Sequence, residues 1–427
     1  MNSSVRSATF TLAAAASLLS SGVALAETPA PEAVLENYAD IALAGYEDAL
    51  ARAKELDAAT DALIEKPSEA TLQTARDAWR ASRPAYQQTE AFRFGNPIVD
   101  DWEGRVNAWP LDEGLIDYVD NSYGSESDEN SLYTANVIAN QTITVNGEQV
   151  DVSTISPELL QDKLQEAGGI EANVATGYHA VEFLLWGQDL HGTEAGAGER
   201  PYTDYATGDE CTGGHCDRRG QYLGAATDLL VSDLEEMVGN WQAEGAARKA
   251  LLDDPTKGLS AILTGMGSLS YGELAGERMK LGLLLHDPEE EHDCFSDNTH
   301  VSHLNDVLGI RNVYTGKYQR VDGKMVEGPA IADLVAAKAP DVDKEIRVDL
   351  DDSVAKFEAI AKAAENGEAY DQQIGEGNDA GNARVQAGID ALITQTRAIE
   401  RAVAALDLGG VTIEGSDSLD NTQAVFQ

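Results

Sequence analysis

The sequence is poor in cysteine, in aromatic residues and in basic residues. It has 3 Cys in 427 residues, and Phe, Trp and Tyr together make up 6% of the chain. Lys and Arg number 30 against 74 Asp and Glu, which gives a formal net charge of −44. Nucleic acid and anionic membrane surfaces would repel such a chain, so neither is expected as a partner. The acidic excess is typical of a solvated surface suited to a salty habitat, although some of the carboxylates could bind cations.

Long apolar segments are missing after the N-terminus. The basic residue Arg6, the apolar residues 8–19 and the Ala-Leu-Ala sequence at residues 24–26 together match a secretory signal peptide. We therefore expect residues 1–26 to be a signal peptide that is removed on export. An apolar stretch well below about 18 residues is too short to remain as a membrane anchor. The rest of the chain has room for one large or two medium domains.

Several catalytic signatures are absent as well. There is no His-Glu-x-x-His motif, and Phe183 occupies the last position of the inverted His-x-x-Glu-His pattern. The chain has no Gly-x-Ser-x-Gly nucleophile elbow and no phosphate-binding loop. The sequence thus gives no direct support for a zinc peptidase, a serine hydrolase or a nucleotide-binding enzyme.

The three cysteines do not have the spacing of a c-type haem site. Cys211 and Cys216 bracket a short Gly-rich segment, and in an exported protein this spacing favours a local disulfide. A soft metal site that includes His215 is the alternative. Cys294 is left over, either buried or as a free thiol.

Apolar residues at helical spacing predict a mainly α fold. Segment 192–220 is expected to be a long surface loop, the chain after His286 to be irregular, and the tail after Gly409 to be loose. Small β-hairpins are predicted at 142–152 and 318–326, because Asn-Gly and Asp-Gly are typical hairpin turns. Helices are expected at 32–66, about 72–86 with Pro84 as a kink or break, 171–190, 222–241, 246–263, 271–285, 331–337, 343–365 and 383–406.

The helical pairs near the two ends of the chain resemble one another in length, alanine content and connector. This echo suggests two helical bundles packed together. The N-terminal bundle would cover about residues 32–245 and the C-terminal bundle about residues 246–408. Because alanine-rich helices echo one another by composition alone, a true duplication and a chance likeness both remain open.

The clearest chemical motif is Gly177-x-His179-x-x-Glu182. On a helix, residues three apart share one face, so His179 and Glu182 could reach a common ion. Imidazole with carboxylate suits zinc, iron or copper, and di-iron bundles use a Glu-x-x-His pair of the same spacing. Gly177 leaves room for another backbone or a ligand to approach. The alternative is a buried histidine that is hydrogen-bonded to a carboxylate, because two side chains do not complete a metal site.

All seven histidines fall between positions 179 and 303, which scattered surface histidines would not be expected to do. The segment 286–300 is particularly dense in oxygen and nitrogen ligands. It does not follow the EF-hand loop pattern. It is either a second source of metal ligands or a solvated acidic loop.

Residues 177–187 (GYHAVEFLLWG) resemble the defining motif of the imelysin family. Residues 271–279 and 287–299 are similar to segments of the family branch called iron-regulated protein A. Further similarity to the family's first conserved helix and its following turn is carried by Trp79, Arg80, Arg83, Tyr86, Glu90 and the pair Trp109-Pro110. The resemblance covers most of the chain after residue 26, so residues 27–427 would form an imelysin-like domain.

The resemblance implies two helical bundles, a place in the periplasm or at the periphery of the outer membrane, and a role linked to iron uptake. It also implies a site where the bundles meet, centred on His179 and Glu182. Glu90 matches a conserved glutamate of the family and is expected as a third metal ligand. Glu277 is a further candidate, for which an ion pair with Arg278 or Arg80 is the alternative.

Three functions remain open at this point. The first is an exported metal-binding protein that holds an iron-type ion or an iron chelate in a cleft between the bundles, with iron or zinc as the bound metal. Its partner would be a periplasmic or outer-membrane uptake component, and ligation rich in carboxylates would favour ferric iron. The second is a metallopeptidase in which Glu182 or Glu90 activates a metal-bound water. The third is a metal-free protein that binds a partner.

Overall fold

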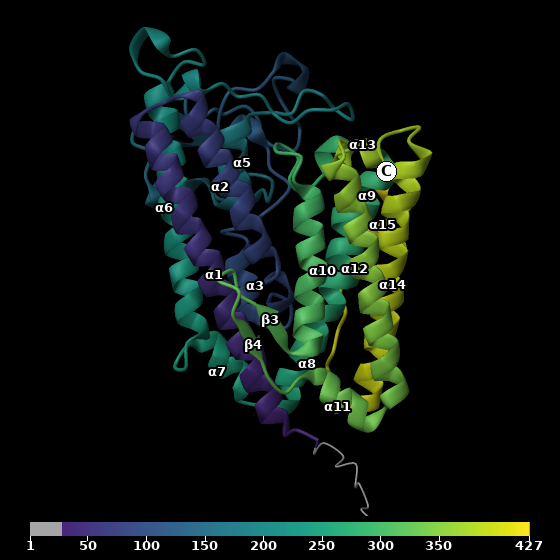
Figure 1. The fold of residues 1–427 in the computed structure, drawn as a ribbon. Coiled ribbons are helices and arrows are strands. Elements are labelled where there is room, and N and C mark those ends of the chain that lie inside the picture. Colours follow the sequence, from purple (N-terminus) through teal and green to yellow (C-terminus); the bar gives the residue numbers. More distant parts are fainter. Residues whose placement is uncertain (1–27, 427) are drawn as a thin grey trace, which may run out of the picture.

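The computed structural model describes residues 28–426, so the expected signal peptide at residues 1–26 lies outside the described residues. The described chain is mainly α-helical and carries two small two-stranded antiparallel sheets, which confirms the predicted fold class (Figure 1). None of the helices within residues 28–426 has the length and apolar character needed to cross a membrane.

Three long helices form the framework of the first half: α1 (Pro31–Glu65), α2 (Glu69–Gln87) and α6 (Cys216–Trp241). α1 packs along both α2 and α6. Ser68 caps α2, because its hydroxyl accepts a hydrogen bond from the Thr71 N–H at 3.2 Å while the Thr71 hydroxyl accepts from the Ser68 N–H at 3.0 Å. Pro84 lies inside α2 and does not break it, because the helix continues to Gln87.

Shorter elements connect α2 to α6: α3 (Pro97–Glu103), β1 (Thr142–Val145), β2 (Glu148–Asp151), α4 (Pro157–Leu159) and α5 (Gly177–Trp186). The predicted first hairpin is confirmed. It turns on Asn146 and Gly147, whose φ angles of 51° and 82° suit a two-residue turn.

The motif helix α5 is shorter than the predicted helix at 171–190. Gly177 at its start and Gly187 after its end have φ angles of 80° and 72°, which lie outside the helical region. A Cβ atom on Gly177 would fall 2.4 Å from the carbonyl oxygen of Val106. The glycine therefore admits another backbone, and this close approach fixes the start of α5.

The predicted helix at 246–263 is wrong, because the chain breaks it into α7 (Ala246–Leu252) and α8 (Pro255–Ser268). Asp254 accepts hydrogen bonds from the N–H groups of Thr256 and Lys257 at 3.0 and 3.3 Å, and Pro255 occupies the first turn. This arrangement starts a new helix. α8 runs on into the π-helix η8 (Leu269–Lys280) and α9 (Leu281–Leu285).

The chain after His286 is not irregular throughout, since α10 (Thr299–Thr315) follows a loop at 286–298. The second predicted hairpin is confirmed as β3 (Lys317–Gln319) and β4 (Met325–Glu327). The remaining helices are α11 (Ile331–Lys338), α12 (Pro340–Glu365), α13 (Tyr370–Ile374), α14 (Asp379–Leu406) and α15 (Asp417–Asp420).

The tail after Gly409 packs against α8 and η8 and is not loose. Ile413 contacts the backbone position of Gly267, and the Ser418 hydroxyl donates to the Gly276 carbonyl at 2.9 Å. The predicted surface loop at 192–220 is also partly buried, with Arg200 and Asp204 in the interior and α6 beginning at Cys216.

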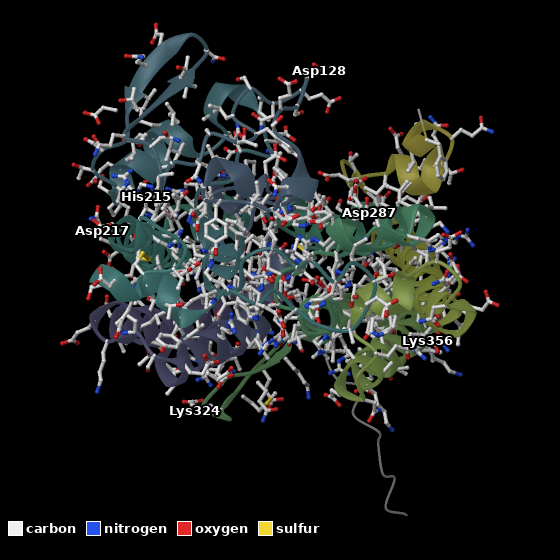
Figure 2. The ribbon with its side chains drawn as sticks, turned by 90° about the horizontal axis from the view of Figure 1, so that it is seen from above. Asp128, His215, Asp217, Asp287, Lys324 and Lys356 are labelled. Carbon is white, nitrogen blue, oxygen red and sulfur yellow. A yellow bond between two sulfur atoms is a disulfide. The ribbon has the colours of Figure 1, made fainter. Side chains whose placement is uncertain are left out.

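Helices α1, α2 and α6 form one group, and α10, α12 and α14 form a second group. The two groups meet where α10 packs on α2. A Cβ atom on Gly309 of α10 would lie 2.6 Å from the carbonyl oxygen of Gln88, so glycine permits this close packing. A large apolar core extends through both groups, and a smaller one lies between η8, α12 and α14. Charged side chains such as Asp128 and Asp217 surround the outside of the ribbon (Figure 2).

Candidate metal centre

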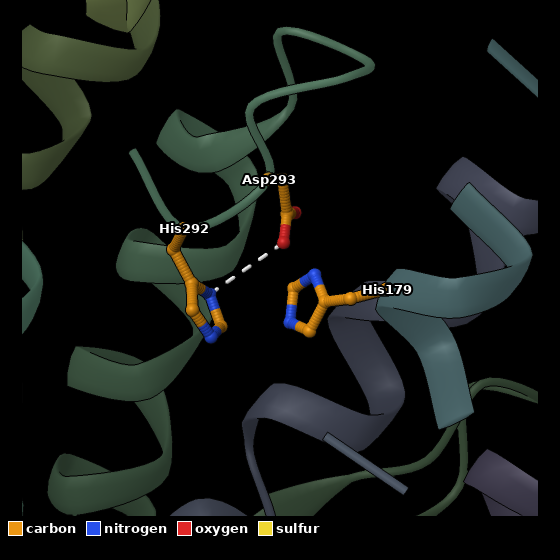
Figure 3. Close-up of side chains that lie close together, drawn as sticks. All are labelled: His179, His292 and Asp293. Atoms are coloured by element: carbon orange, nitrogen blue, oxygen red, sulfur yellow. Dashed lines mark ion pairs between the residues drawn. The ribbon is translucent and has the colours of Figure 1, made fainter. Parts of the chain in front are cut away.

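Three buried side chains bring potential metal ligands together near the junction of the two groups of helices. His179, His292 and Asp293 each place one ligand atom within 4.8 Å of the others (Figure 3). We call these three residues the His–Asp cluster. His179 comes from α5, and the other two come from the loop that precedes α10. The sequence-predicted His179 therefore meets ligands supplied by a distant part of the chain.

Glu182 orients the ring of His179. Its Oε2 atom lies 3.2 Å from His179 Nδ1, while its Oε1 atom accepts hydrogen bonds from the Ser296 N–H at 3.0 Å and the Ser296 hydroxyl at 2.6 Å. Burial raises the pKa of Glu182, and the neighbouring Asp293 carboxylate adds to this rise. Metal-binding histidines commonly form such a hydrogen bond to a carboxyl group through their second ring nitrogen. Glu182 therefore supports His179 and is not a member of the cluster.

Helix α2 holds the loop that carries Asp293. Arg80 donates to the Ser296 carbonyl at 3.0 Å, and Arg83 donates to Asp293 Oδ1 at 3.0 Å. Asp293 Oδ2 accepts from Asn298 at 3.1 Å and from the Ser302 hydroxyl. Although burial acts to raise the pKa of Asp293, the charge of Arg83 lowers it overall. The carboxylate is therefore ionised at neutral pH.

The histidines at the cluster are neutral. Burial, assisted by nearby arginine charge, lowers the pKa of His179 to about 3 and that of His303 in α10 to about 3. It also lowers the pKa of His292. The His179 and His292 ring centroids lie 4.7 Å apart, and those of His292 and His303 lie 6.2 Å apart. Neutral imidazoles offer the lone pairs that a metal ion needs.

Five ring nitrogens in this region have no hydrogen-bond partner among the described residues: His179 Nε2, and both nitrogens of His292 and of His303. The closest approach of His292 Nδ1 to Asp293 is 3.5 Å, too long for a firm hydrogen bond. A buried polar group without a partner costs about 1–3 kcal/mol. Two imidazoles and a carboxylate match the ligand sets of non-haem ferrous iron and of catalytic zinc, so the residues present fit such an ion.

The other two sequence candidates lie outside the His–Asp cluster. Glu90 is buried and accepts from Arg278 at 2.8 Å, and Arg278 also contacts Glu273 at 2.7 Å and Asp306 at 3.3 Å. Glu277 is exposed and forms no ion pair with any described residue, Arg278 included. The expected third ligand is therefore an ion-pair partner, and the further candidate lies at the surface.

Sequence reasoning did not select His292 and Asp293 as ligands. The signal for them was the gathering of histidines and carboxylates at 286–300. The alternative interpretation of segment 286–300 as a solvated acidic loop is wrong for its middle part, because Glu291, His292 and Asp293 are each at most 1% exposed. Cys211 and Cys216 form a disulfide, and Cys294 is a half-buried free cysteine.

The fold and the cluster define a class of mainly helical proteins with a buried imidazole–carboxylate group where two sets of helices meet. The sequence model of the family described as Imelysin matches residues 42–399, which is most of the chain, and the protein belongs to this family.

Named relatives add detail to this membership. The chain is 32% identical over 83 residues to iron-regulated protein A of Synechococcus elongatus, a match that spans 19% of this chain and 23% of that relative. Its fold is similar to the solved structure of an iron-regulated protein A precursor from Parabacteroides distasonis (TM-score 0.64, 18% identity, 90% of this chain and 97% of that one). An imelysin-like protein from Psychrobacter arcticum is similar as well (TM-score 0.55, 15% identity, 88% and 96%). At these identities the solved structures show a shared fold.

Proposed function

We propose that this protein binds an iron-type metal ion at the His–Asp cluster and serves iron acquisition. The observation that carries the proposal is the buried Nε2 atom of His179. It has no hydrogen-bond partner among the described residues, and its ring lies beside that of His292, with centroids 4.7 Å apart (Figure 3). The other ring nitrogen, Nδ1, lies 3.2 Å from Glu182 Oε2. The relatives named for iron regulation support iron as the cargo.

The ligand set suits a divalent ion. Two neutral imidazoles and one ionised carboxylate are the donors that ferrous iron and zinc accept, whereas an all-oxygen set would favour ferric iron. Asp293 keeps its ion pair with Arg83 at 3.0 Å, so a positive charge already lies beside the cluster. This charge weakens the hold on a cation, as release of a transported ion requires.

The proposal includes export. A signal peptide at residues 1–26 would deliver the chain to the periplasm or the periphery of the outer membrane, where an uptake component would receive the metal. N-terminal sequencing of the protein from the periplasmic fraction tests this part. Residue 27 is the expected first residue, and an intact Met1 in the cytoplasmic fraction would contradict it.

The central test is the metal content of protein purified without chelators and then exposed to ferrous iron under anaerobic conditions. We expect one bound ion per chain, and a loss of most of this metal in His179→Ala and in His292→Ala. His191→Ala removes a half-exposed histidine outside the cluster and is the matched control. Equal metal content in all four proteins would contradict the proposal.

The contacts do not favour hydrolysis as a second function. A metallopeptidase needs a carboxylate that can take a proton from metal-bound water. Both oxygens of Glu182 are engaged by Ser296 and His179, and Glu90 is paired with Arg278. Neither glutamate is therefore free to act as a general base toward a metal-bound water at the cluster.

A further inference from the structure

A cavity of about 420 Å³ adjoins the His–Asp cluster. Its wall includes His292, which therefore belongs both to the cavity and to the cluster. Trp109 also lines the cavity, and its ring centroid lies 5.7 Å from that of His292. The cavity offers the buried cluster a connection toward the solvent. We call it the glutamate vestibule, after the five glutamates in its lining: Glu103, Glu166, Glu171, Glu273 and Glu277.

Buried polar groups without partners face this cavity. His292 is 1% exposed, and neither of its ring nitrogens has a hydrogen-bond partner within residues 28–426. Asn107 is 2% exposed; its Oδ1 atom accepts from Arg83, whereas its Nδ2 atom has no partner in the described part of the chain. Such groups are satisfied by a ligand or by water that enters the cavity.

The charge of the vestibule is strongly negative. Within residues 28–426, Arg93 and Arg278 are the basic residues that contribute to its lining. Both are already neutralised by carboxylates, since Arg93 pairs with Asp100 at 2.9 Å and Arg278 pairs with Glu90 and Glu273. They therefore leave no free positive charge in the wall.

The outer carboxylates, by contrast, are free to meet an ion. Glu166, Glu171 and Glu277 are exposed, and none of them forms an ion pair within residues 28–426. A cleft lined with one sign of charge concentrates counter-ions and can raise association rates by about 10- to 1,000-fold. Here the favoured counter-ion is a cation.

We propose that the glutamate vestibule is the entrance to the His–Asp cluster and that it admits the cargo as an unchelated, hydrated cation. Glu166, Glu171 and Glu277 collect the ion, and His292, which belongs to both the vestibule and the cluster, is the first cluster residue to receive it. A metal chelate that carries carboxylates would meet the same negative charge and be repelled. This inference rests on the proposed function, because it needs an ion-binding cluster behind the vestibule.

The test is the rate at which ferrous iron binds, measured by stopped-flow mixing under anaerobic conditions at low ionic strength. The variant carries Glu166→Gln, Glu171→Gln and Glu277→Gln. The matched control carries Glu126→Gln, Glu129→Gln and Glu148→Gln, three exposed glutamates outside the cavity, so that both proteins have the same net charge.

We expect the vestibule variant to bind iron about tenfold more slowly than the control and the wild type. All three proteins should reach the same stoichiometry at equilibrium, measured by mass spectrometry. The difference in rate should vanish at about 1 M salt, where the screening length is about 3 Å. Ferric citrate should load the wild type much more slowly than ferrous iron does.

Each contrary result has its own meaning. Equal rates in the vestibule variant and the control would overturn the vestibule and leave the metal site standing. Loading by ferric citrate as fast as by ferrous iron would overturn the inference that the cargo enters unchelated. A wild type that binds no metal would overturn the proposed function and the vestibule with it.

Discussion

The protein buries two clusters of charged and polar side chains that differ in how well their groups are paired. The first, which we call the paired cluster, consists of Asp117, Arg200, Asp204 and Arg219. Arg219 donates to both oxygens of Asp117 at 2.6 and 2.9 Å, and Arg200 donates to Asp117 at 2.7 Å and to Asp204 at 3.0 Å. In the His–Asp cluster, three of the four imidazole nitrogens have no hydrogen-bond partner among the residues that the structure describes.

This difference separates a cluster that is satisfied within the protein from the candidate metal site. In the paired cluster two guanidinium groups face two carboxylates, so charge and hydrogen bonding are largely satisfied inside the protein. In the His–Asp cluster the unpartnered ring nitrogens of the buried imidazoles remain available to a ligand or to water. Both clusters are buried and contain charged groups, and the unpartnered ring nitrogens are what distinguishes the candidate metal site.

The largest expected effect comes from breaking the paired cluster. Asp117→Asn removes the carboxylate shared by Arg200 and Arg219 and leaves buried positive charge uncompensated. We expect a loss of about 3–5 kcal/mol in the free energy of unfolding, measured with urea. The exposed Asp120→Asn is the control and should unfold with the wild type. An Asp117→Asn protein of wild-type stability would show that the pairing contributes little.

A smaller effect is expected from the residue that supports the His–Asp cluster. Glu182→Gln keeps the size of the side chain but weakens its hold on His179. We expect the affinity for ferrous iron or zinc to fall about 10- to 100-fold, measured by competition with a chelator. Glu113→Gln changes another buried glutamate, outside the cluster, and should leave this affinity unchanged. Unchanged affinity in Glu182→Gln would mean that the glutamate does not position the ring.

The disulfide should matter to the paired cluster alone. Cys211 and Cys216 close a short loop in which the Gly214 carbonyl accepts a hydrogen bond from Arg219 at 3.0 Å. Replacing both cysteines with serine should reduce the free energy of unfolding by about 2 kcal/mol, as expected for so short a loop. Metal affinity, measured on the same protein, should not change. A loss of metal binding would show that the two clusters are coupled.

The pH dependence of stability should reveal the buried histidines in and beside the His–Asp cluster. The folded protein holds the pKa of His303 at about 3, against an ordinary value of 6.5, because the ring is buried. Between these two pKa values the unfolded chain binds a proton at His303 and the folded chain does not. The free energy of unfolding therefore falls as the pH falls below about 6.5. One such group contributes up to about 1.4 kcal/mol per pH unit.

His303→Leu removes this contribution. Urea unfolding of the metal-free protein at pH 7, 6 and 5 should therefore give a shallower decline in stability for His303→Leu than for the wild type. His191→Leu, at a half-exposed position, is the control. Parallel declines for His303→Leu and the wild type would show that His303 takes up its proton in the folded state too.

Local signals predicted much of the fold. The Asn146-Gly147 turn and the long periodic helices α1, α12 and α14 lie close to their predicted places. α10 was missed because its buried residues include Ser302, His303 and Asp306, so the helix has no apolar stripe to reveal it. The pair Asp254-Pro255 is a sequence signal for the break between α7 and α8. Apolar residues continue at helical spacing on both sides of this pair, and for that reason a single helix was predicted.

The candidate site was predictable only where its residues are close in sequence. His179 and Glu182 are three residues apart, and they interact in the structure as the helical spacing requires. Glu182 and Ser296 are 114 positions apart, and Arg83 and Asp293 are 210 apart, so no local pattern could pair them. The same holds for Glu90, whose carboxylate pairs with Arg278.

The sequence by itself determined the helical character, the hairpin turns, the acidic surface and the pairing of His179 with Glu182. Each of these depends on neighbours along the chain. Tertiary structure alone decided that His292 and Asp293 complete the cluster, and that Glu277 lies in the vestibule wall. These outcomes depend on how α2, α5 and α10 pack, because burial removes water and leaves each polar group only the partners that the fold brings to it.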